Sequence, residues 1–283
     1  MNPFDSKNLR VAFQGEPGAF SEAAAVQLLG GAITTVPRVT FEAAFSAIAE
    51  GAADALLAPV ENSLAGSVVR VFDLLLESRL SIAAETILPI EMQLIAIPGT
   101  SLADVRFVAS HPMALAQCER FFAAHPRWHR LPAEDTAGSV REMLARGDKS
   151  CAAIAGRRAA EHYHAVILAE SIQDNSENFT RFVLLLPEDE AALWISIEAR
   201  KVSLAMRLAH RPGALLASLE PFAKYGVNLL KIESRPIHGR PWEYQFFIDV
   251  EAETPARLDS ALSEVRAATS EFRVLGRYLA ASR

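Results

Sequence analysis

The sequence predicts an α/β protein in which two α/β lobes surround a cleft and a smaller C-terminal domain of βαββαβ order follows. From Leu9 onward, short β-like runs alternate with amphipathic helical stretches, which is typical of parallel sheets with helical crossovers. A longer extended stretch at residues 81–98 interrupts this alternation, and segments of this kind often cross between lobes. After Arg200 the pattern changes to that of a separate small domain.

The elements of the two lobes follow from the alternation. In the first lobe we expect strands at residues 10–14, 33–36 and 53–60, and helices at residues 21–29 and 41–50. The extended stretch, which contains Pro89 and Pro98, comes next. In a second alternating set we expect strands at residues 106–110, 128–131 and 151–155, and helices at residues 113–124 and 137–146. Further strands are expected after this set, at residues 166–172 and 181–186.

The C-terminal domain begins with a half-buried strand. Apolar side chains alternate with polar or small ones over residues 201–208, which is the period of a strand with one buried face. A helix at residues 213–225 should end at Gly226, a residue suited to the C-terminal cap. We then expect a strand at residues 227–234, a turn containing Pro236, Gly239 and Pro241, a strand at 243–250, a helix after Pro255 and a strand at 273–278. This order is the ferredoxin-like arrangement, so we expect domains at residues 1–190 and 198–283, with a linker near residues 187–190.

Composition excludes several classes of protein. The 283 residues are 51% apolar and 22% charged with a formal net charge of −6, so no basic field favours nucleic acid or an anionic membrane. No apolar run approaches the length of a membrane span, and we expect a soluble, cytoplasmic protein. The two cysteines, Cys118 and Cys151, do not indicate a disulfide framework and are expected to be buried thiols.

Residues 178–182, Asn-Phe-Thr-Arg-Phe, form the most informative motif. They place an amide, a hydroxyl and a cation just before an apolar run that reads as a strand. Arg181 can pair with a carboxylate in bidentate fashion, while Thr180 and Asn178 supply directional hydrogen bonds. The motif therefore indicates a binding site for an acidic small molecule.

Other polar residues stand where strands meet helices, and each has a structural alternative. Glycines at residues 15–18 fit an anion-binding loop or ordinary turns. Asn62 and Ser63 end the third strand, where open α/β sheets bind ligands, but helix capping explains them equally well. Ser110 ends another strand, Gln117 lies in the helix that follows, and Asp135-Thr136 opens the next helix, where simple capping is favoured.

Histidine spacing does not support a metal site. His125 and His129 are four residues apart, but Pro126 interrupts the helix that this spacing requires. His162 and His164 have no obvious third ligand. The residues by themselves thus indicate a two-lobed binder of small acids that uses no metal.

Seven motifs in order extend this interpretation. They are residues 15–22, 59–63 with Gly66, 110–112, 135–137, 178–182, 213–215 and 233–236. With them the chain resembles the prephenate dehydratase family, in the monofunctional bacterial form with a C-terminal ACT regulatory domain. The likeness extends from about Leu9 to Tyr278. It implies a catalytic domain built like the two-lobed periplasmic binding proteins, and dehydration with decarboxylation of prephenate to phenylpyruvate, without a cofactor, on the way to phenylalanine.

The resemblance also implies roles for individual residues. Thr180 is expected to donate to the leaving hydroxyl, mainly by positioning and electrostatic stabilisation because a threonine hydroxyl is a poor acid. The expected substrate-binding residues are Glu61, Asn62, Ser63, Ser110, Gln117, Thr136, Asn178, Arg181 and Phe182. The expected phenylalanine pocket, usually formed at a subunit interface of a homodimer or homotetramer, comprises Gly213, Ala214, Leu215, Asn228, Glu233, Ser234, Arg235 and Pro236. From the residues alone, a simple helix start at Gly213 and a simple strand end at Pro236 are favoured over a pocket.

Two residues depart from the family pattern. Met113 stands where many members have glutamine, which affects the polarity of the cleft, and Leu230 replaces a frequent threonine, which affects effector affinity. Arogenate remains an alternative substrate. A non-catalytic solute-binding protein and a pure amino-acid sensor are further alternatives, disfavoured by the missing signal segment and by the attached tail. No mutase activity is expected, since fused mutase helices have no room before Leu9.

Overall fold

The computed structural model describes residues 9–237 and 239–281. Its backbone divides into two compact units. The two-lobed unit contains residues 9–71 and 86–182, and the tail unit contains residues 72–85, 183–237 and 239–281. Helix α3 (Val69–Glu77) and strands β5 (Leu80–Pro89) and β11 (Phe179–Pro187) begin in one unit and end in the other.

The first lobe of the two-lobed unit is a sheet in which β1 pairs with β2 and β3 in parallel. Its elements are β1 (Arg10–Gln14), α1 (Phe20–Leu29), β2 (Thr34–Arg38), α2 (Phe41–Ala49), β3 (Ala55–Asn62) and the short β4 (Gly66–Ser67), which pairs antiparallel with β3. Because β1, β2 and β3 are parallel, their carboxyl ends meet at one edge of the sheet. Open α/β sheets bind ligands at this edge.

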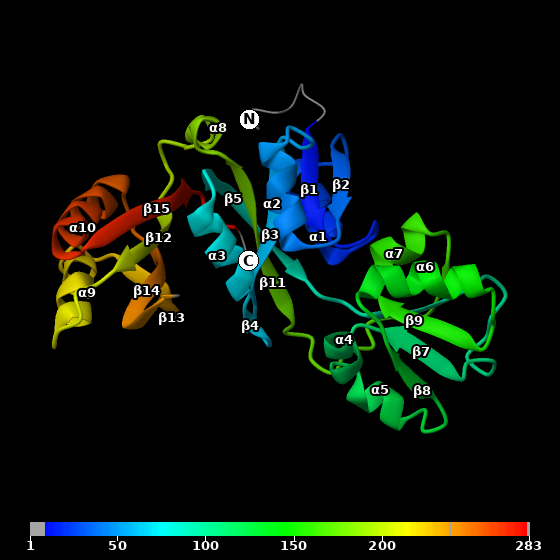
Figure 1. The fold of residues 1–283 in the computed structure, drawn as a ribbon. Coiled ribbons are helices and arrows are strands. Elements are labelled where there is room, and N and C mark those ends of the chain that lie inside the picture. Colours follow the sequence, from blue (N-terminus) through cyan, green and yellow to red (C-terminus); the bar gives the residue numbers. More distant parts are fainter. Residues whose placement is uncertain (1–8, 238, 282–283) are drawn as a thin grey trace. The chain divides into compact units, whose positions relative to one another are not determined.

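The second lobe is a five-stranded sheet of order β10-β6-β9-β7-β8. Its elements are β6 (Gln93–Ala96), β7 (Phe107–Ser110), α4 (Pro112–Ala116), α5 (Glu119–Ala123), β8 (His129–Pro132), α6 (Thr136–Arg146), β9 (Cys151–Ala155), α7 (Arg157–His162) and β10 (Val166–Ala169). Figure 1 shows α6 and α7 on one face of the sheet and α4 and α5 on the other. A separate hydrophobic core lies under each pair of helices, so both faces of this sheet are buried.

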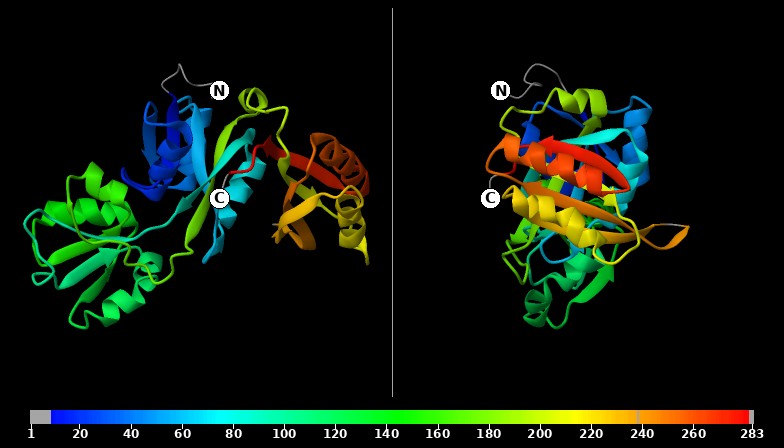
Figure 2. Two further views of the ribbon diagram at one scale, coloured as in Figure 1. Left: turned by 180° about the vertical axis from the view of Figure 1, so that it is seen from behind. Right: turned by 90° about the vertical axis from the view of Figure 1, so that its left-hand side faces the viewer.

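The tail unit confirms the predicted βαββαβ order. After the short helix α8 (Glu188–Ala192) come β12 (Lys201–Arg207), α9 (Ala214–Lys224), β13 (Asn228–Ile237), β14 (Arg240–Glu251), α10 (Pro255–Ala268) and β15 (Glu271–Tyr278). The strand order is β13-β14-β12-β15-β5, so β13 is an edge strand. Figure 2 shows α9, in yellow, beside α10, in orange, and a core of apolar side chains lies between these helices and the sheet.

Several predicted boundaries were wrong. The helix expected at residues 113–124 is broken into α4 and α5, and Gln117 caps α4 instead of lying within a helix. A tertiary contact causes the break, because the Asp174 carboxylate accepts from the N–H groups of Glu119 and Arg120 and so starts a new helix there. Pro236 lies within β13 instead of in a turn, which an edge strand tolerates because proline lacks only a ladder donor.

Helices α3 and α7 were not predicted, and the expected linker at residues 187–190 is occupied by the end of β11 and by α8. The domain division at residues 1–190 and 198–283 stays a prediction, since the compact units divide the chain differently. Among residues 9–237 and 239–281, no helix has the length and apolar character needed to cross a membrane.

Candidate active site

Thr180 lies near the start of β11 with 8% of its surface exposed. Its Oγ1 accepts a hydrogen bond of 2.9 Å from the Asn62 side-chain amide. A hydroxyl has two acceptor positions and one proton, so this bond fixes the oxygen while the proton stays available for a ligand acceptor. The arrangement suits a residue that donates to a leaving group.

Asn62, the last residue of β3, holds this geometry. Its Oδ1 accepts from the N–H groups of Leu64 at 3.0 Å and Ala65 at 2.8 Å, which closes the turn between β3 and β4. These two donors determine which end of the amide carries oxygen, so Nδ2 must point toward Thr180. The same Nδ2 also donates to Asn178 Oδ1 at 2.8 Å and to the Phe179 carbonyl at 3.2 Å.

Asn178 connects the two lobes. It is 1% exposed, and its Nδ2 donates to Gln117 Oε1 at 3.0 Å. Gln117 ends α4 in the second lobe, whereas Asn62 belongs to the first. The structure therefore brings together four residues predicted from sequence, Thr180, Asn62, Asn178 and Gln117, in one chain of hydrogen bonds.

Ser63, Glu61 and Arg181 lie around this chain. Ser63 Oγ donates to the Glu177 carbonyl at 2.7 Å and accepts from the Phe179 N–H at 2.9 Å, so it fastens β3 to the strand carrying Thr180. Arg181 Nη1 lies 3.9 Å from Glu61 Oε2, and the arginine side chain is only 11% exposed. A guanidinium can hold a ligand carboxylate through two parallel hydrogen bonds, and Glu61 is the competing anion here.

Three other predicted residues have clear structural roles. Ser110 is fully buried and donates to the Ile154 carbonyl at 2.6 Å, and Phe182 is 2% exposed in the core. Thr136 is the first residue of α6, and the Asp135 carboxylate accepts from the Gly138 N–H at 2.6 Å, which confirms the capping interpretation of Asp135. Substrate contacts of Ser110, Thr136 and Phe182 stay predictions.

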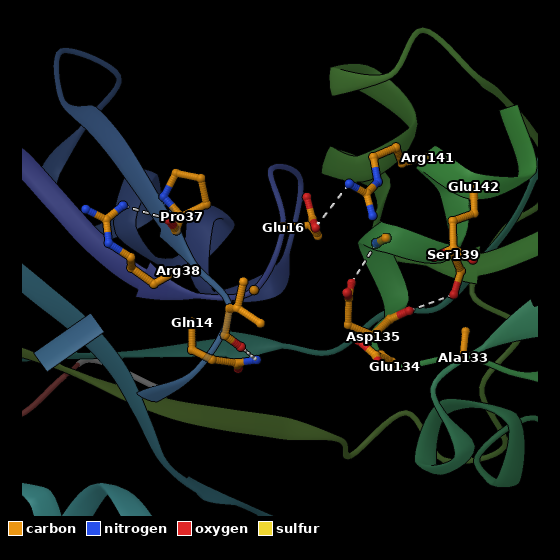
Figure 3. A pocket seen from close by; sticks show the side chains of 13 residues that line it. Gln14, Glu16, Pro37, Arg38, Ala133, Glu134, Asp135, Ser139, Arg141 and Glu142 are labelled. Carbon is orange, nitrogen blue, oxygen red and sulfur yellow. Dashed lines mark hydrogen bonds and ion pairs between the residues drawn. The ribbon is translucent and has the colours of Figure 1, made fainter. Parts of the chain in front are cut away.

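A cavity of about 310 Å³ lies at the same edge of the first sheet. Figure 3 shows Gln14 and Arg38 on one side of it and Asp135, Ser139 and Arg141 on the other. Of these residues, Asp135 was singled out in the sequence, whereas Gln14, Arg38, Ser139 and Arg141 were missed. Gln14 and Arg38 are the last residues of β1 and β2, so the rule that singled out Asn62 at the end of β3 identifies them too.

The two lobes are also joined through Glu22 of α1. Its carboxylate accepts from the Gly18 N–H at 2.6 Å and from Thr35 Oγ1 at 3.0 Å, and lies 3.0 Å from Arg158 of α7. Burial raises the pKa of Glu22, but these three partners outweigh it and hold the pKa below its ordinary value. Because Glu22 occupies the Gly18 N–H, the structure favours a turn over an anion-binding loop at residues 15–18.

The predicted effector residues lie on α9 and β13. Gly213 is the N-cap of α9 with φ +78°, a left-handed conformation that glycine adopts without strain, and space around it is open. Ala214 begins the helix, Leu215 is 36% exposed, and Asn228 begins β13. The helix start and the edge strand thus both present exposed residues of the predicted pocket.

The Glu233–Pro236 motif is divided between two faces of β13. Successive strand residues point to opposite faces. Arg235 points to the face that meets α3, where its Nη2 lies 3.6 Å from Asp73, and Glu233 lies 3.6 Å from Lys231 on the same face. Ser234 and Pro236 point the other way and are exposed.

Comparison with known proteins identifies two families that match successive parts of the sequence. The sequence model of prephenate dehydratase matches residues 11–190, and that of the ACT domain matches residues 202–267. Arogenate dehydratase 3, chloroplastic, of Arabidopsis thaliana is 42% identical over 98% of this chain and 68% of its own length. The bifunctional chorismate mutase/prephenate dehydratase of Aquifex aeolicus (strain VF5) is 36% identical over 96% of this chain and 74% of its own length.

Solved structures give the same result for the whole described chain. The prephenate dehydratase of Arthrobacter aurescens, determined in complex with L-Phe, has a TM-score of 0.84 at 33% identity and covers 96% of this chain and 90% of its own. A protein described as GqqA, a novel type of quorum quenching acylase, has a TM-score of 0.87 at 33% identity, with 96% and 98% covered. Since the catalytic-domain match spans more than half of the sequence, the chain belongs to the prephenate dehydratase family and is a carbon–oxygen lyase of the prephenate/arogenate dehydratase type with a C-terminal ACT domain.

Proposed function

We propose that this protein converts prephenate to phenylpyruvate in phenylalanine biosynthesis and that phenylalanine inhibits it through the ACT domain. In this reaction the bond from the ring to its carboxylate breaks, and its electron pair enters the ring and expels the hydroxyl at the opposite carbon. That hydroxyl takes up one proton and leaves as water, while the carboxylate leaves as CO₂. The ring becomes aromatic, so the enzyme needs only to orient the dianion and stabilise the departing oxygen.

The observation that carries the proposal is the hydrogen-bond chain ending at Thr180. Asn62 Nδ2 donates to the Thr180 oxygen at 2.9 Å, so the hydroxyl proton is left for donation to a bound ligand. A preorganised donor of this kind stabilises charge that develops on a leaving group without reorganisation. Arg181 is our choice for one substrate carboxylate, and Glu61, Asn62, Ser63, Gln117 and Asn178 shape the site around it.

Arogenate is the second candidate substrate, because the first-named relative is an arogenate dehydratase at 42% identity. Arogenate carries an ammonium group where prephenate has a keto group. Both substrates leave the same ring chemistry to Thr180, so the distinction lies at the side-chain end. Parallel measurements of kcat/KM for the two compounds, with product identification, decide between them.

Acyl hydrolysis, suggested by the name of one structural neighbour, is poorly supported. It requires a nucleophile activated by an adjacent base. Thr180 Oγ1 instead accepts from an amide, which cannot take its proton. If neither ring substrate is turned over and an acylated substrate is hydrolysed instead, the proposed lyase function is refuted.

The regulatory part of the proposal assigns the catalytic domain to residues 1–190 and the ACT domain to residues 198–283. Phenylalanine then binds near the start of α9 and the exposed face of β13, around Gly213, Leu215, Asn228 and Ser234. The unpaired edge of β13 and its exposed Leu230 and Ile232 suit a second copy of the chain, as in a homodimer or homotetramer. Initial rates measured against phenylalanine concentration, together with sedimentation, test this assignment.

A further inference from the structure

Arg273 of β15 is bound to the end of a helix that belongs to the catalytic part of the sequence. Its two Nη atoms donate to the carbonyl oxygens of four residues at or just after the C-terminus of α3. These residues are Leu75 at 3.2 Å, Leu76 at 2.9 Å, Ser78 at 2.9 Å and Leu80 at 3.3 Å. The side chain is 30% exposed and also pairs with Glu188 at 3.0 Å.

The last carbonyls of a helix have no partner within the helix, and the helix dipole places partial negative charge there. A cation that donates to them therefore stabilises the end of the helix. With nine residues, α3 is too short to be stable by itself and depends on such contacts. Arg273 is thus a cap that strand β15 supplies to the end of α3, a helix that precedes the βαββαβ segment by more than a hundred residues in sequence.

The other end of α3 is fastened beside the candidate active site. Strand β4, which directly precedes it, pairs Ser67 with Glu61 and Gly66 with Asn62. The Val68 N–H also donates to the Val60 carbonyl at 3.0 Å. Val71 and Leu75 on the helix itself are fully buried, so packing holds α3 on both sides of its middle.

We propose that Arg273 is a positioning residue for the dehydratase reaction. It holds α3 in place, α3 holds β4, and β4 holds the turn in which Asn62 aims its amide at Thr180. The inference rests on the proposed catalytic role of the Asn62–Thr180 pair. It assigns the tail a part in basal turnover that is separate from effector binding.

The middle of α3 contacts strands β13 and β14. Phe72 of α3 lies 4.9 Å, between ring centroids, from Phe247 of β14, and the Lys231 Nζ lies 5.1 Å from the Phe72 ring. Arg235 lies 3.6 Å from Asp73. Strand β13, which carries half of the proposed effector pocket, thus contacts α3, the helix that Arg273 caps. The positioning of the β3–β4 turn and the control by an effector therefore both act through α3.

The test compares two arginines of the same strand. Arg273→Ala removes the cap on α3, whereas Arg277→Ala removes bonds to the Ala199 carbonyl and Asp259, which lie within the tail. Small misplacements of catalytic groups reduce turnover steeply, so we expect kcat of Arg273→Ala to fall roughly 10-fold with KM changed less than about 2-fold. Arg273→Lys should recover part of kcat, and Arg277→Ala should keep it.

Hydrogen exchange gives the second measurement. Amides of residues 61–77 should exchange faster in Arg273→Ala than in Arg277→Ala at equal fraction folded. Equal kcat values for the two alanine variants would overturn the proposal, as would a lower melting temperature for Arg273→Ala with unchanged kcat. If Arg273→Ala fails to fold, Arg273→Lys is compared with Arg277→Lys instead. A wild-type kcat in both lysine variants would then overturn the proposal. Thr180→Val, assayed alongside, tests the proposed function separately.

Discussion

Replacing Thr180 by valine isolates the hydroxyl on which the proposed mechanism depends. Valine keeps the branched shape at this 8% exposed position and removes one oxygen. Asn62 Nδ2 then loses its 2.9 Å bond to Thr180 but keeps Asn178 Oδ1 and the Phe179 carbonyl as acceptors. Since no donor is stranded, the free energy of unfolding should fall by only about 0.5–1.5 kcal/mol, the typical net value of one hydrogen bond.

The rate should respond far more strongly than the stability. Removing one preorganised donor to a developing charge commonly lowers kcat by roughly 10²- to 10³-fold, equivalent to about 3–4 kcal/mol of barrier. Thr180→Ser keeps the hydroxyl and should retain much of the activity. The prediction is therefore a transition-state effect at least twice the effect on folding.

Thr35→Val is the matched control. Thr35 is also a strand threonine of the two-lobed unit with a side-chain bond, here 3.0 Å to Glu22, so its loss should cost similar stability. We expect it to turn over substrate at nearly the wild-type rate. The assay is the steady-state rate of phenylpyruvate formation, with urea unfolding of each variant. If Thr180→Val and Thr35→Val had the same kcat, the reasoning that places Thr180 at the leaving hydroxyl would be refuted.

Three further outcomes are expected. Arg181→Lys keeps the charge but loses the planar guanidinium, so it should raise KM clearly above the wild-type value, and Arg181→Ala should raise KM further. If wild type and both variants have equal KM values, Arg181 does not bind a substrate carboxylate. Asparagine can adopt the left-handed backbone conformation found at residue 213, so Gly213→Asn should keep its turnover. Its inhibition should require higher phenylalanine concentrations than that of the wild type. An unchanged inhibition curve would mean that phenylalanine binds elsewhere. Because the pKa of Glu22 is lowered in the folded protein, its stabilisation is present above the ordinary carboxyl pKa of about 4.3 and is lost as the pH falls through the folded value. Glu22→Gln should therefore lower the free energy of unfolding at pH 7. The variant's free energy of unfolding should also fall less than that of the wild type between pH 7 and the acid range below the ordinary carboxyl pKa. Urea unfolding of both proteins at pH 7 and in that acid range measures the two effects.

The hydrophobic period predicted most of the fold, because the side chains of one strand or helix face share a core. In β12, Val202, Leu204 and Met206 face the helices as the alternation indicated. The residues between them are buried as well, so the expectation of a half-buried strand was wrong. The break between α4 and α5 was not predictable in this way, because it depends on Asp174, which is more than fifty residues away in sequence. Local patterns do not contain contacts of that range.

The candidate site was predicted in part for a similar reason. Thr180, Asn62 and Asn178 stand at strand ends, where sequence indicates polar function. Gln117 was expected within a helix, and only the family resemblance indicated its role. The buried hydroxyl of Ser110 has the same sequence signature, yet it bonds to a backbone carbonyl. The Thr180 and Ser110 hydroxyls differ only in the direction of their side chains, and packing sets that direction.

The structure also changes how regulation must be tested. Glu85 on β5 is buried, and its carboxylate accepts from Lys201 Nζ at 2.7 and 2.8 Å and from the Ala281 N–H at 2.9 Å. Removal of the tail takes away both donors, and loss of one partner of a buried ion pair typically costs about 3–5 kcal/mol. Total stability of a domain is only about 5–15 kcal/mol, so a chain cut after Glu190 is expected to lose a large part of its stability along with its effector site. Point substitutions such as Gly213→Asn are therefore the sound way to separate inhibition from catalysis.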